Sequence, residues 1–156
     1  MSPSAPEPAP DQADNVVQPF LRQRYALRAT KDYLARHGRP RDEGDFAQHH
    51  FVAGDETVSR APFYRWLAAH APAEAITFRA SSDVVQRDAI MQGAGLGFLP
   101  ARLVRENPEL EEVMSAREDW TSTLWLVTHV DLHRTNKVRS FLSFLKQEAK
   151  TWPMDD

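Results

Sequence analysis

The stretch ASSDVVQRDAIMQGAGLGFLP, residues 80–100, carries most of the information from which a fold can be predicted for this chain. It opens with Ser81, Ser82 and Asp83, residues whose side-chain oxygens can accept hydrogen bonds from backbone N–H groups at the start of a helix. Apolar residues follow at helical spacing, at Val84, Val85, Ala89 and Ile90. The first half of the stretch therefore predicts a short helix with one apolar face.

The second half predicts a turn and then a strand. Gly93 stands where a helix end favours a left-handed residue, and Gly95 and Gly97 permit a close backbone turn. The strand that follows contains Leu96, Phe98 and Leu99 and ends at Pro100. A dinucleotide-binding loop has the opposite order, because it follows a strand and opens a helix. We therefore interpret these glycines as a structural turn and not as a phosphate site.

Further strands and helices alternate along the rest of the chain. Residues 75–80 and 123–128 have the composition of strands, and residues 135–150 have that of an amphipathic helix. The apolar stripe of that helix consists of Val138, Phe141, Leu142, Leu145 and Ala149. Such alternation predicts an α/β fold.

Three blocks of the chain resemble the effector-binding domain of LysR-type transcriptional regulators. The first is Ser82-Asp83 together with GAGLGFLP at 93–100. The second, KDYLARHGRP at 31–40, is similar to the segment that opens the family's second subdomain. The third, LWLVTHVDL at 124–132 with VRSFLSFL at 138–145, is similar to the family's C-terminal return segment. The blocks follow the family's order and spacing.

The resemblance implies a periplasmic-binding-protein-like (type 2) fold, in which two α/β subdomains hold a small ligand in the cleft between them. Residues 21–112 would form a nearly complete second subdomain, and residues 121–150 would return to a partial first subdomain. We expect the Pro- and Ala-rich residues 1–20 to be disordered and residues 151–156 to form a C-terminal tail. Nothing before residue 21 resembles the family's winged helix-turn-helix, so we expect a truncated sensor that does not bind DNA directly.

Composition narrows the function further. A chain of 156 residues has room for one domain, and its net charge of −3 argues against a nucleic-acid surface over the whole chain. The absence of cysteine excludes disulfides and thiolate chemistry. No apolar run is long enough to span a bilayer, and the N-terminus lacks the apolar core of a signal peptide. We therefore predict a soluble cytoplasmic protein without a membrane partner.

The predicted effector site centres on the start of the helix in residues 80–100. Hydroxyl and free N–H groups there can hold an anion, and the resemblance implies that this position lines the effector cleft. Plain helix capping is the alternative for the two serines, and the charge of the aspartate opposes anion binding. The predicted effector-binding residues are Ser81, Ser82, Asp83, Phe98, Leu99 and Pro100. Candidate carboxylate clamps are Arg28, Arg60 and Arg79.

Other chemistries find less support. The six histidines include the pair His129 and His133, but no convergent set of three or four zinc ligands is evident, so we predict no metal site. No nucleophile elbow or carboxylate dyad is present, so we predict no enzyme and no cofactor. The leading hypothesis is a small-molecule effector-sensing domain for an anionic or aromatic metabolite, which regulates transcription in a full-length context. The alternative is an interaction module that pairs with itself or with a paralogous regulator, without ligand or DNA.

Overall fold

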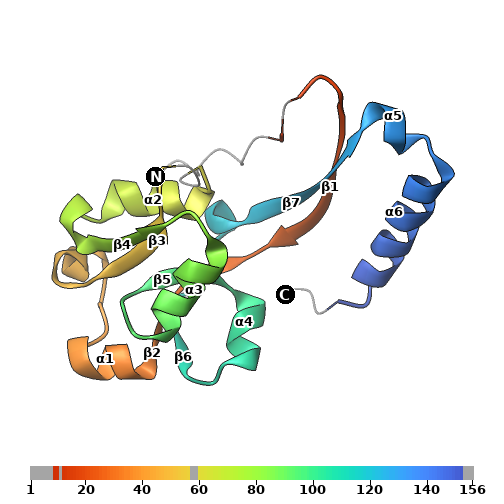
Figure 1. Ribbon diagram of the computed structural model, residues 1–156. Coiled ribbons are helices and arrows are strands. Elements are labelled where there is room, and N and C mark those ends of the chain that lie inside the picture. The colour runs from red at the N-terminus through yellow and green to blue at the C-terminus, as the bar shows by residue number, and fades with distance from the viewer. Residues whose placement is uncertain (1–8, 11, 57–59, 153–156) are drawn as a thin grey trace. The chain divides into compact units, whose positions relative to one another are not determined.

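The computed structural model of the protein describes residues 9–10, 12–56 and 60–152, which form two compact units (Figure 1). The larger unit comprises the described residues between 24 and 122, and the smaller unit combines those before residue 24 with residues 123–152. Parts of the segments that we expected to be disordered or a tail, residues 1–8, 11 and 153–156, lie outside the described residues. No helix in the described ranges is long and apolar enough to cross a membrane.

The larger unit alternates strands with helices, which confirms the predicted α/β class. β2 (Tyr25–Thr30) is the central strand of an antiparallel sheet, between β5 (Gly97–Pro100) and β6 (Leu110–Met114). β3 (Phe51–Gly54) and β4 (Ile76–Ala80) pair in parallel. The backbone of Leu96 joins the two sheets, because its N–H donates to the carbonyl of His50 and its carbonyl accepts from Val52, both at 2.8 Å.

The helices of the larger unit begin and end at the signals that the sequence contains. Thr30 caps the first helix by accepting a hydrogen bond from the N–H of Tyr33 at 3.1 Å. Gly93 has a φ of +80°, which confirms the predicted left-handed turn after the third helix. The helices are α1 (Lys31–His37), α2 (Pro62–His70), α3 (Asp83–Met91) and α4 (Ala101–Glu106), with short 3-10 helices η1 (Glu43–Gln48), η2 (Ala73–Ala75) and η3 (Glu118–Trp120).

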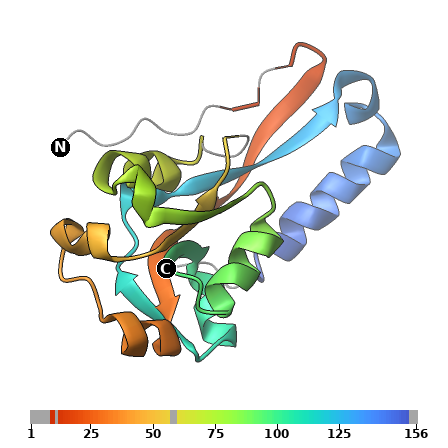
Figure 2. The ribbon, with the colours of Figure 1, turned by 60° about the vertical axis from the view of Figure 1, so that its left-hand side comes forward.

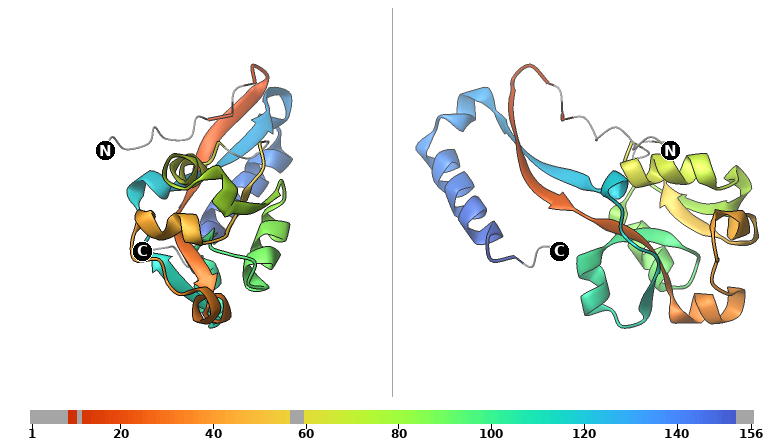
Figure 3. Two further views of the ribbon diagram at one scale, coloured as in Figure 1. Left: turned by 90° about the vertical axis from the view of Figure 1, so that its left-hand side faces the viewer. Right: turned by 180° about the vertical axis from the view of Figure 1, so that it is seen from behind.

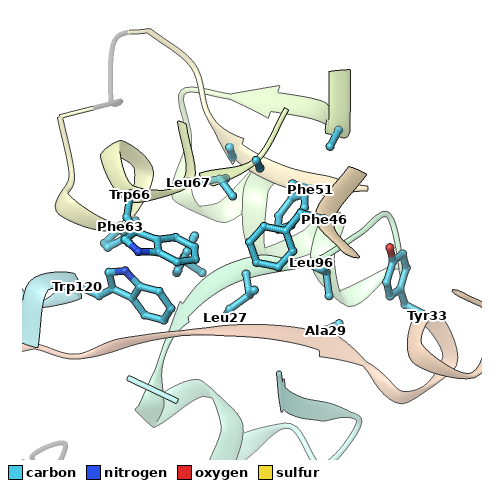
Figure 4. Packing of buried hydrophobic residues seen from close by; sticks show 14 residues of the cluster. Leu27, Ala29, Tyr33, Phe46, Phe51, Phe63, Trp66, Leu67, Leu96 and Trp120 are labelled. Atoms are coloured by element: carbon cyan, nitrogen blue, oxygen red, sulfur yellow. The ribbon is translucent and has the colours of Figure 1, made fainter. Parts of the chain in front are cut away.

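The core of the larger unit is aromatic (Figure 4). Trp66 of α2 and Trp120 of η3 meet edge to face with ring centroids 4.9 Å apart, and Phe98 lies 5.0 Å from Trp120. A second cluster, on the other face of β5, consists of Val52, Ile90, Leu99 and Leu110. The fully buried Trp120 belongs to this core, so the larger unit extends to Ser122, and the subdomain boundary near residue 112 stays a prediction.

The smaller unit contains a two-stranded sheet, β1 (Asn15–Gln23) with β7 (Ser122–His129). The two strands run side by side in Figures 2 and 3. Two helices follow, α5 (Val130–His133) and α6 (Asn136–Ala149). The end of α6 is held to β1 by a hydrogen bond of 2.6 Å from Lys146 to Gln18 and by edge-to-face packing of Trp152 on Phe20 at 5.8 Å.

The structure differs from the sequence-based expectation at β1. Residues 15–20, which we expected to be disordered, belong to this strand, because β7 supplies backbone partners from more than one hundred residues away. The strand expected from residue 21 to residue 28 is also two strands, β1 and β2, separated at Arg24. A strand stabilised by so distant a partner gives no local signal beyond a few apolar residues.

Candidate functional site

The candidate site starts at the carboxyl ends of two parallel strands. The last residues of β3 and β4, Gly54 and Ala80, are paired, so both strands end at one edge of the sheet. In open α/β sheets, ligands bind beyond such carboxyl ends. Ser81 and Ser82 follow β4 directly and Asp83 opens α3, so the fold puts three of the six predicted residues at this edge (Figure 1).

The two serines have different structural roles. Ser82 is the helix cap: its backbone is extended, and its hydroxyl accepts a hydrogen bond from the N–H of Val85 at 3.5 Å. Ser81 precedes the cap and, like Ser82, is exposed. The capping role that we considered for these residues is thus taken by Ser82, and its long hydrogen bond is a weak one. Contact of either serine with a ligand stays a prediction.

Asp83 is the first residue of α3, and its side chain is exposed. A carboxylate at this position interacts favourably with the helix dipole, and it competes with any anion that approaches the same helix end. Its charge is also felt by a neighbour on α2. Burial raises the pKa of the Tyr64 hydroxyl, and the negative charge of Asp83 raises it further, with a contribution from Tyr25. Tyr64 is therefore a neutral hydrogen-bonding group at physiological pH.

Sequence reasoning missed two residues that support this edge, Gln86 and Tyr64. Gln86 is only 6% exposed, although it is polar. Its amide nitrogen donates to the carbonyl of Ala80 at 2.7 Å, and its amide oxygen accepts a short hydrogen bond from the Tyr64 hydroxyl. These contacts tie α3 to the end of β4 and to α2. The signal in the sequence was a polar residue one turn before Ile90, on the buried face of a helix.

The three predicted residues of β5 do not share one environment. Phe98 pairs with Leu27 and belongs to the large aromatic cluster, whereas Leu99 faces the opposite side of the sheet in the cluster of Ile90. Both are 4% exposed. Pro100 is half-buried, opposite Tyr25. Alternation along a strand therefore separates Leu99 from Phe98, and only one of them can face a given ligand.

An aromatic group connects Phe98 to the start of α3. The rings of Tyr25 and Phe63 stack at 4.2 Å, and Phe63 lies 5.3 Å from Phe98. Tyr64, which is hydrogen-bonded to Gln86, lies 6.4 Å from Phe98. The structure thus brings Phe98 near the serine-containing edge through its neighbours on α2, while Leu99 lies in the other core cluster.

The three candidate arginine clamps have different environments. The guanidinium of Arg79 donates to the carbonyl of Gly54 at 3.3 Å, at the edge where β3 and β4 end. The side chain of Arg28 is 4% exposed and pairs with Glu112 at 3.4 Å, which makes it part of the core. Arg60 is exposed. Arg79 is therefore the candidate clamp whose position fits the site.

A separate group of histidines surrounds Tyr33 in the larger unit. The Tyr33 hydroxyl accepts a hydrogen bond from the backbone N–H of His50 at 3.1 Å, and it forms a second hydrogen bond of 2.9 Å with Nδ1 of His49, whose direction depends on the imidazole tautomer. Burial lowers the pKa of His49, as do the neighbouring His37 and His50, against an opposing effect of Asp45. A pocket of about 430 Å³ adjoins this group, lined by Ala47, Gln48, His49, His50, Pro72, Glu74 and Ala75.

None of the six predicted effector residues lines that pocket. Among the described residues, no three or more His, Asp or Glu side chains converge as they would around a metal ion. His129 contacts Asp131 at 3.6 Å, and His133 is hydrogen-bonded to Thr128 at 2.9 Å. These two histidines therefore have separate local partners.

Comparison with known families identifies the chain. The family model described as "LysR substrate binding domain" matches residues 5–150. The chain belongs to the LysR substrate-binding domain family. This result confirms the resemblance that the three sequence blocks indicated, and the mixed α/β fold is the periplasmic-binding-protein-like type 2 fold of LysR regulatory domains.

Individual LysR proteins agree with this assignment. The chain is 26% identical over 141 residues to the probable HTH-type transcriptional regulator LtrA of Klebsiella pneumoniae, with 83% of this chain and 45% of LtrA covered. The regulatory domain of CrgA from Neisseria meningitidis superposes with a TM-score of 0.71 at 25% identity, covering 89% of this chain and 71% of that domain. Full-length AphB of Vibrio cholerae superposes with a TM-score of 0.65 at 20% identity, covering 90% and 50%.

The chain therefore spans less than half the length of LtrA and about half that of full-length AphB. LtrA and CrgA are transcriptional regulators by name, and their family's domain is a binding domain of regulators.

Proposed function

We propose that this chain is an effector-sensing domain that binds a small anionic or aromatic metabolite at the start of α3. The observation that carries the proposal is the position of Ser81 and Ser82, exposed at a helix N-terminus where β3 and β4 both end. The guanidinium of Arg79 at the same edge supplies positive charge. Membership in the LysR substrate-binding domain family supports ligand binding as the function.

The chemistry of this edge favours a carboxylate that is attached to a planar or apolar body. N–H groups at the start of a helix, hydroxyl groups and a guanidinium all donate hydrogen bonds to an oxyanion. Tyr64 adds a neutral hydroxyl and an aromatic ring, and Phe98 and Pro100 border the same group of rings. The exposed Asp83 sets a limit, because it disfavours ligands with several negative charges at this helix end.

Binding can be tested with a library of small carboxylates, in thermal shift and isothermal titration experiments on the 156-residue chain. We expect at least one aromatic carboxylate to bind, and Ser81→Ala and Arg79→Gln each to weaken it about tenfold. Ser115→Ala, an exposed serine of the same unit outside these elements, is the matched control. If no carboxylate binds, or if the control weakens binding as much as Ser81→Ala does, the proposal fails.

In a full-length regulator, such binding acts on transcription through a change in the sensor's conformation. A ligand that binds one arrangement more tightly than another shifts the population between the two. We propose that catalysis, direct contact with DNA and a membrane partner are not part of this chain's role. A cytoplasmic location and the oligomeric state of the regulator stay predictions.

A second candidate function is an interaction module that pairs with itself or with a paralogous regulator. The observation that favours it is the apolar surface of the smaller unit. Phe141 and Phe144 are 60% and 61% exposed, and Leu124 and Val127 of β7 are 42% and 44% exposed. Monomeric proteins seldom leave several large apolar side chains of one small region in water. Sedimentation velocity at rising concentrations tests the pairing of the chain with itself, which a monomer at all concentrations would contradict.

A further inference from the structure

The helix α6 has two stripes of side chains, of which one is buried or half-buried and the other is exposed. The inner stripe consists of Val138, Leu142, Leu145 and Ala149, of which Leu142 and Ala149 are 8% and 6% exposed and the other two are half-buried. The outer stripe consists of Lys137, Phe141, Phe144 and Glu148, all exposed. We predicted a single stripe that included Phe141, but its 60% exposure places it on the outer one.

The outer stripe has the spacing of a helix–helix seam. Its members follow one another at intervals of four, three and four residues, the alternation that keeps side chains on one line along a helix packed against another. The two phenylalanines occupy the centre, a lysine stands at the amino end and a glutamate at the carboxyl end. A surface of this kind is complementary to its own copy when the copy runs in the opposite direction.

We propose that α6 pairs antiparallel with α6 of a second copy of this chain, and this inference rests on the interaction function proposed above. About a two-fold axis between residues 142 and 143, Phe141 faces the partner's Phe144, and Lys137 faces the partner's Glu148. Each phenylalanine occurs twice, so four aromatic rings form the centre of the seam. Two lysine–glutamate pairs close its ends.

Charge determines the direction of the pairing. In a parallel pair, Lys137 would face Lys137 of the partner subunit and Glu148 would face Glu148 of the partner subunit, so like charges would repel at both ends. The antiparallel pair converts both repulsions into attractions. The residues that flank the outer stripe on one side, Ser140 and Gln147, are uncharged. They therefore add no electrostatic repulsion to the antiparallel pair.

The size of the seam sets the expected affinity. A helix of 14 residues is about 21 Å long, which is too short for an interface of standard area. The dimer therefore belongs to the weak, reversible class, with a dissociation constant in the micromolar range. At lower concentrations the chain is a monomer with both phenylalanines in water, which is the state that the structure shows for α6.

Sedimentation equilibrium on the full chain over a hundredfold range of concentration, about 2–200 μM, tests the pairing. We expect a reversible monomer–dimer equilibrium. Phe141→Glu should weaken dimerisation at least about tenfold, because it puts a charge at the centre of the seam on both sides. Circular dichroism melting of the same variant reports whether the fold is intact, which we expect because the side chain is 60% exposed.

A charge swap tests the register independently of the phenylalanines. Lys137→Glu alone and Glu148→Lys alone should each weaken the dimer about three- to tenfold. The double variant K137E/E148K should return to within about threefold of the parent, and an equimolar mixture of the two single variants should form heterodimers. Arg139→Glu is the matched control, since it makes the same charge change on α6 outside the stripe, and it should leave dimerisation unchanged.

The outcomes separate this inference from the functions on which it builds. A monomer at 200 μM, about the highest concentration tested, overturns both the pairing and the self-association on which it rests. A dimer that Phe141→Glu does not weaken, or a charge swap without recovery, overturns the α6 seam and leaves the interaction function standing. Ligand binding at α3 is measured separately with the carboxylate library, so its failure has no bearing on this result.

Discussion

The two units of this protein differ in how much of their apolar surface they bury by themselves. In the larger unit, the side chains of Tyr33, Phe46, Phe51 and Trp120 are completely buried. In the described part of the smaller unit, only Leu142 and Ala149 fall in the buried class. The large apolar residues that the smaller unit exposes are Leu124, Val127, Val130, Leu132, Phe141, Phe144 and Trp152.

The difference follows from the number of layers in each unit. In the larger unit, helices and strands supply side chains for two clusters, one on each face of β5. The smaller unit has a two-stranded sheet and one long helix, and a two-stranded sheet is marginally stable in water without further cover. The comparison teaches that this chain has one core that buries its large apolar side chains by itself and one region that leaves most of them exposed.

The largest effect is expected at the centre of the core of the larger unit. Trp120→Ala removes a completely buried indole that packs on Trp66 and Phe98, and it should lower the free energy of unfolding by about 3–5 kcal/mol. Phe144→Ala, at a side chain that is 61% exposed, should change the monomer's stability by less than about 0.5 kcal/mol. Urea unfolding at low protein concentration measures both, and equal losses would contradict the comparison.

A smaller loss is expected where two backbones approach in the larger unit. A Cβ atom on Gly95 would collide with the backbone carbonyl of His50, which accepts the hydrogen bond from Leu96. Gly95→Ala should therefore cost about 1–3 kcal/mol, because the connection between β3 and β5 has to shift. Gly38→Ala tests a different cost, since a Cβ there meets nothing within 4 Å and the opposition comes from backbone strain alone, at φ 78° and ψ 171°. If Gly95→Ala leaves the free energy of unfolding unchanged, the connection between β3 and β5 is not tightly packed.

Loss of the cap of α3 is expected to reduce the stability of the larger unit by a smaller amount. Ser82→Ala removes a hydrogen bond of 3.5 Å to the N–H of Val85 and should destabilise the larger unit by about 0.5–1 kcal/mol. Ser81→Ala removes no cap and should leave the melting temperature unchanged. Differential scanning calorimetry compares the two variants. A larger loss from Ser81→Ala would mean that the capping role is assigned to the wrong serine.

The smallest expected effect is a pH dependence located in the larger unit. The pKa of His49 is lowered from its usual 6.5, so the unfolded chain takes up a proton more readily than the folded one. Stability should therefore be fully present above pH 6.5 and decrease as the pH falls below it. His49→Asn, which keeps a hydrogen-bonding partner for the Tyr33 hydroxyl, should reduce this decrease in melting experiments between about pH 7 and 5.

The matched control is Ser115→Ala, at an exposed residue of the same unit that carries no titratable side chain, which should leave the slope unchanged. The groups around His49 that carry or gain charge are His37, His50 and Asp45. If the melting temperature of His49→Asn falls with pH as steeply as that of the parent chain, the acid sensitivity comes from other groups. The pH dependence then cannot be assigned to His49 of the larger unit.

The elements with local signals were predictable from the sequence. The cap at Ser82, the left-handed Gly93 and the short strand before Pro100 depend on residues within one or two turns of each other, and each is where the sequence places it. The family could be recognised for the same reason, because its motifs are contiguous blocks. Of the candidate site, the serines at the start of α3 were predictable, since capping is a local pattern.

The contacts that depend on distant residues were not predictable in this way. Leu99 and Phe98 are adjacent apolar residues, yet the pairing of β5 with β2 sends them to opposite faces of the sheet. Gln86 is a site residue only because Tyr64 and Ala80 lie beside it. The apolar residues of α6 form one stripe in the sequence, but in the structure Leu142 and Ala149 are buried while Phe141 and Phe144 are exposed.

The amino-acid sequence by itself thus determined the family, the α/β class and the order of the local elements. These follow from propensities, caps and periodicities that act over a few residues. The tertiary structure was needed to establish that β1 is a strand, that Phe98 and Leu99 are separated, and that Phe141 and Phe144 lie in water. Strand partners and solvent exposure are set by groups that lie far apart in the chain, and only the folded backbone brings those groups together.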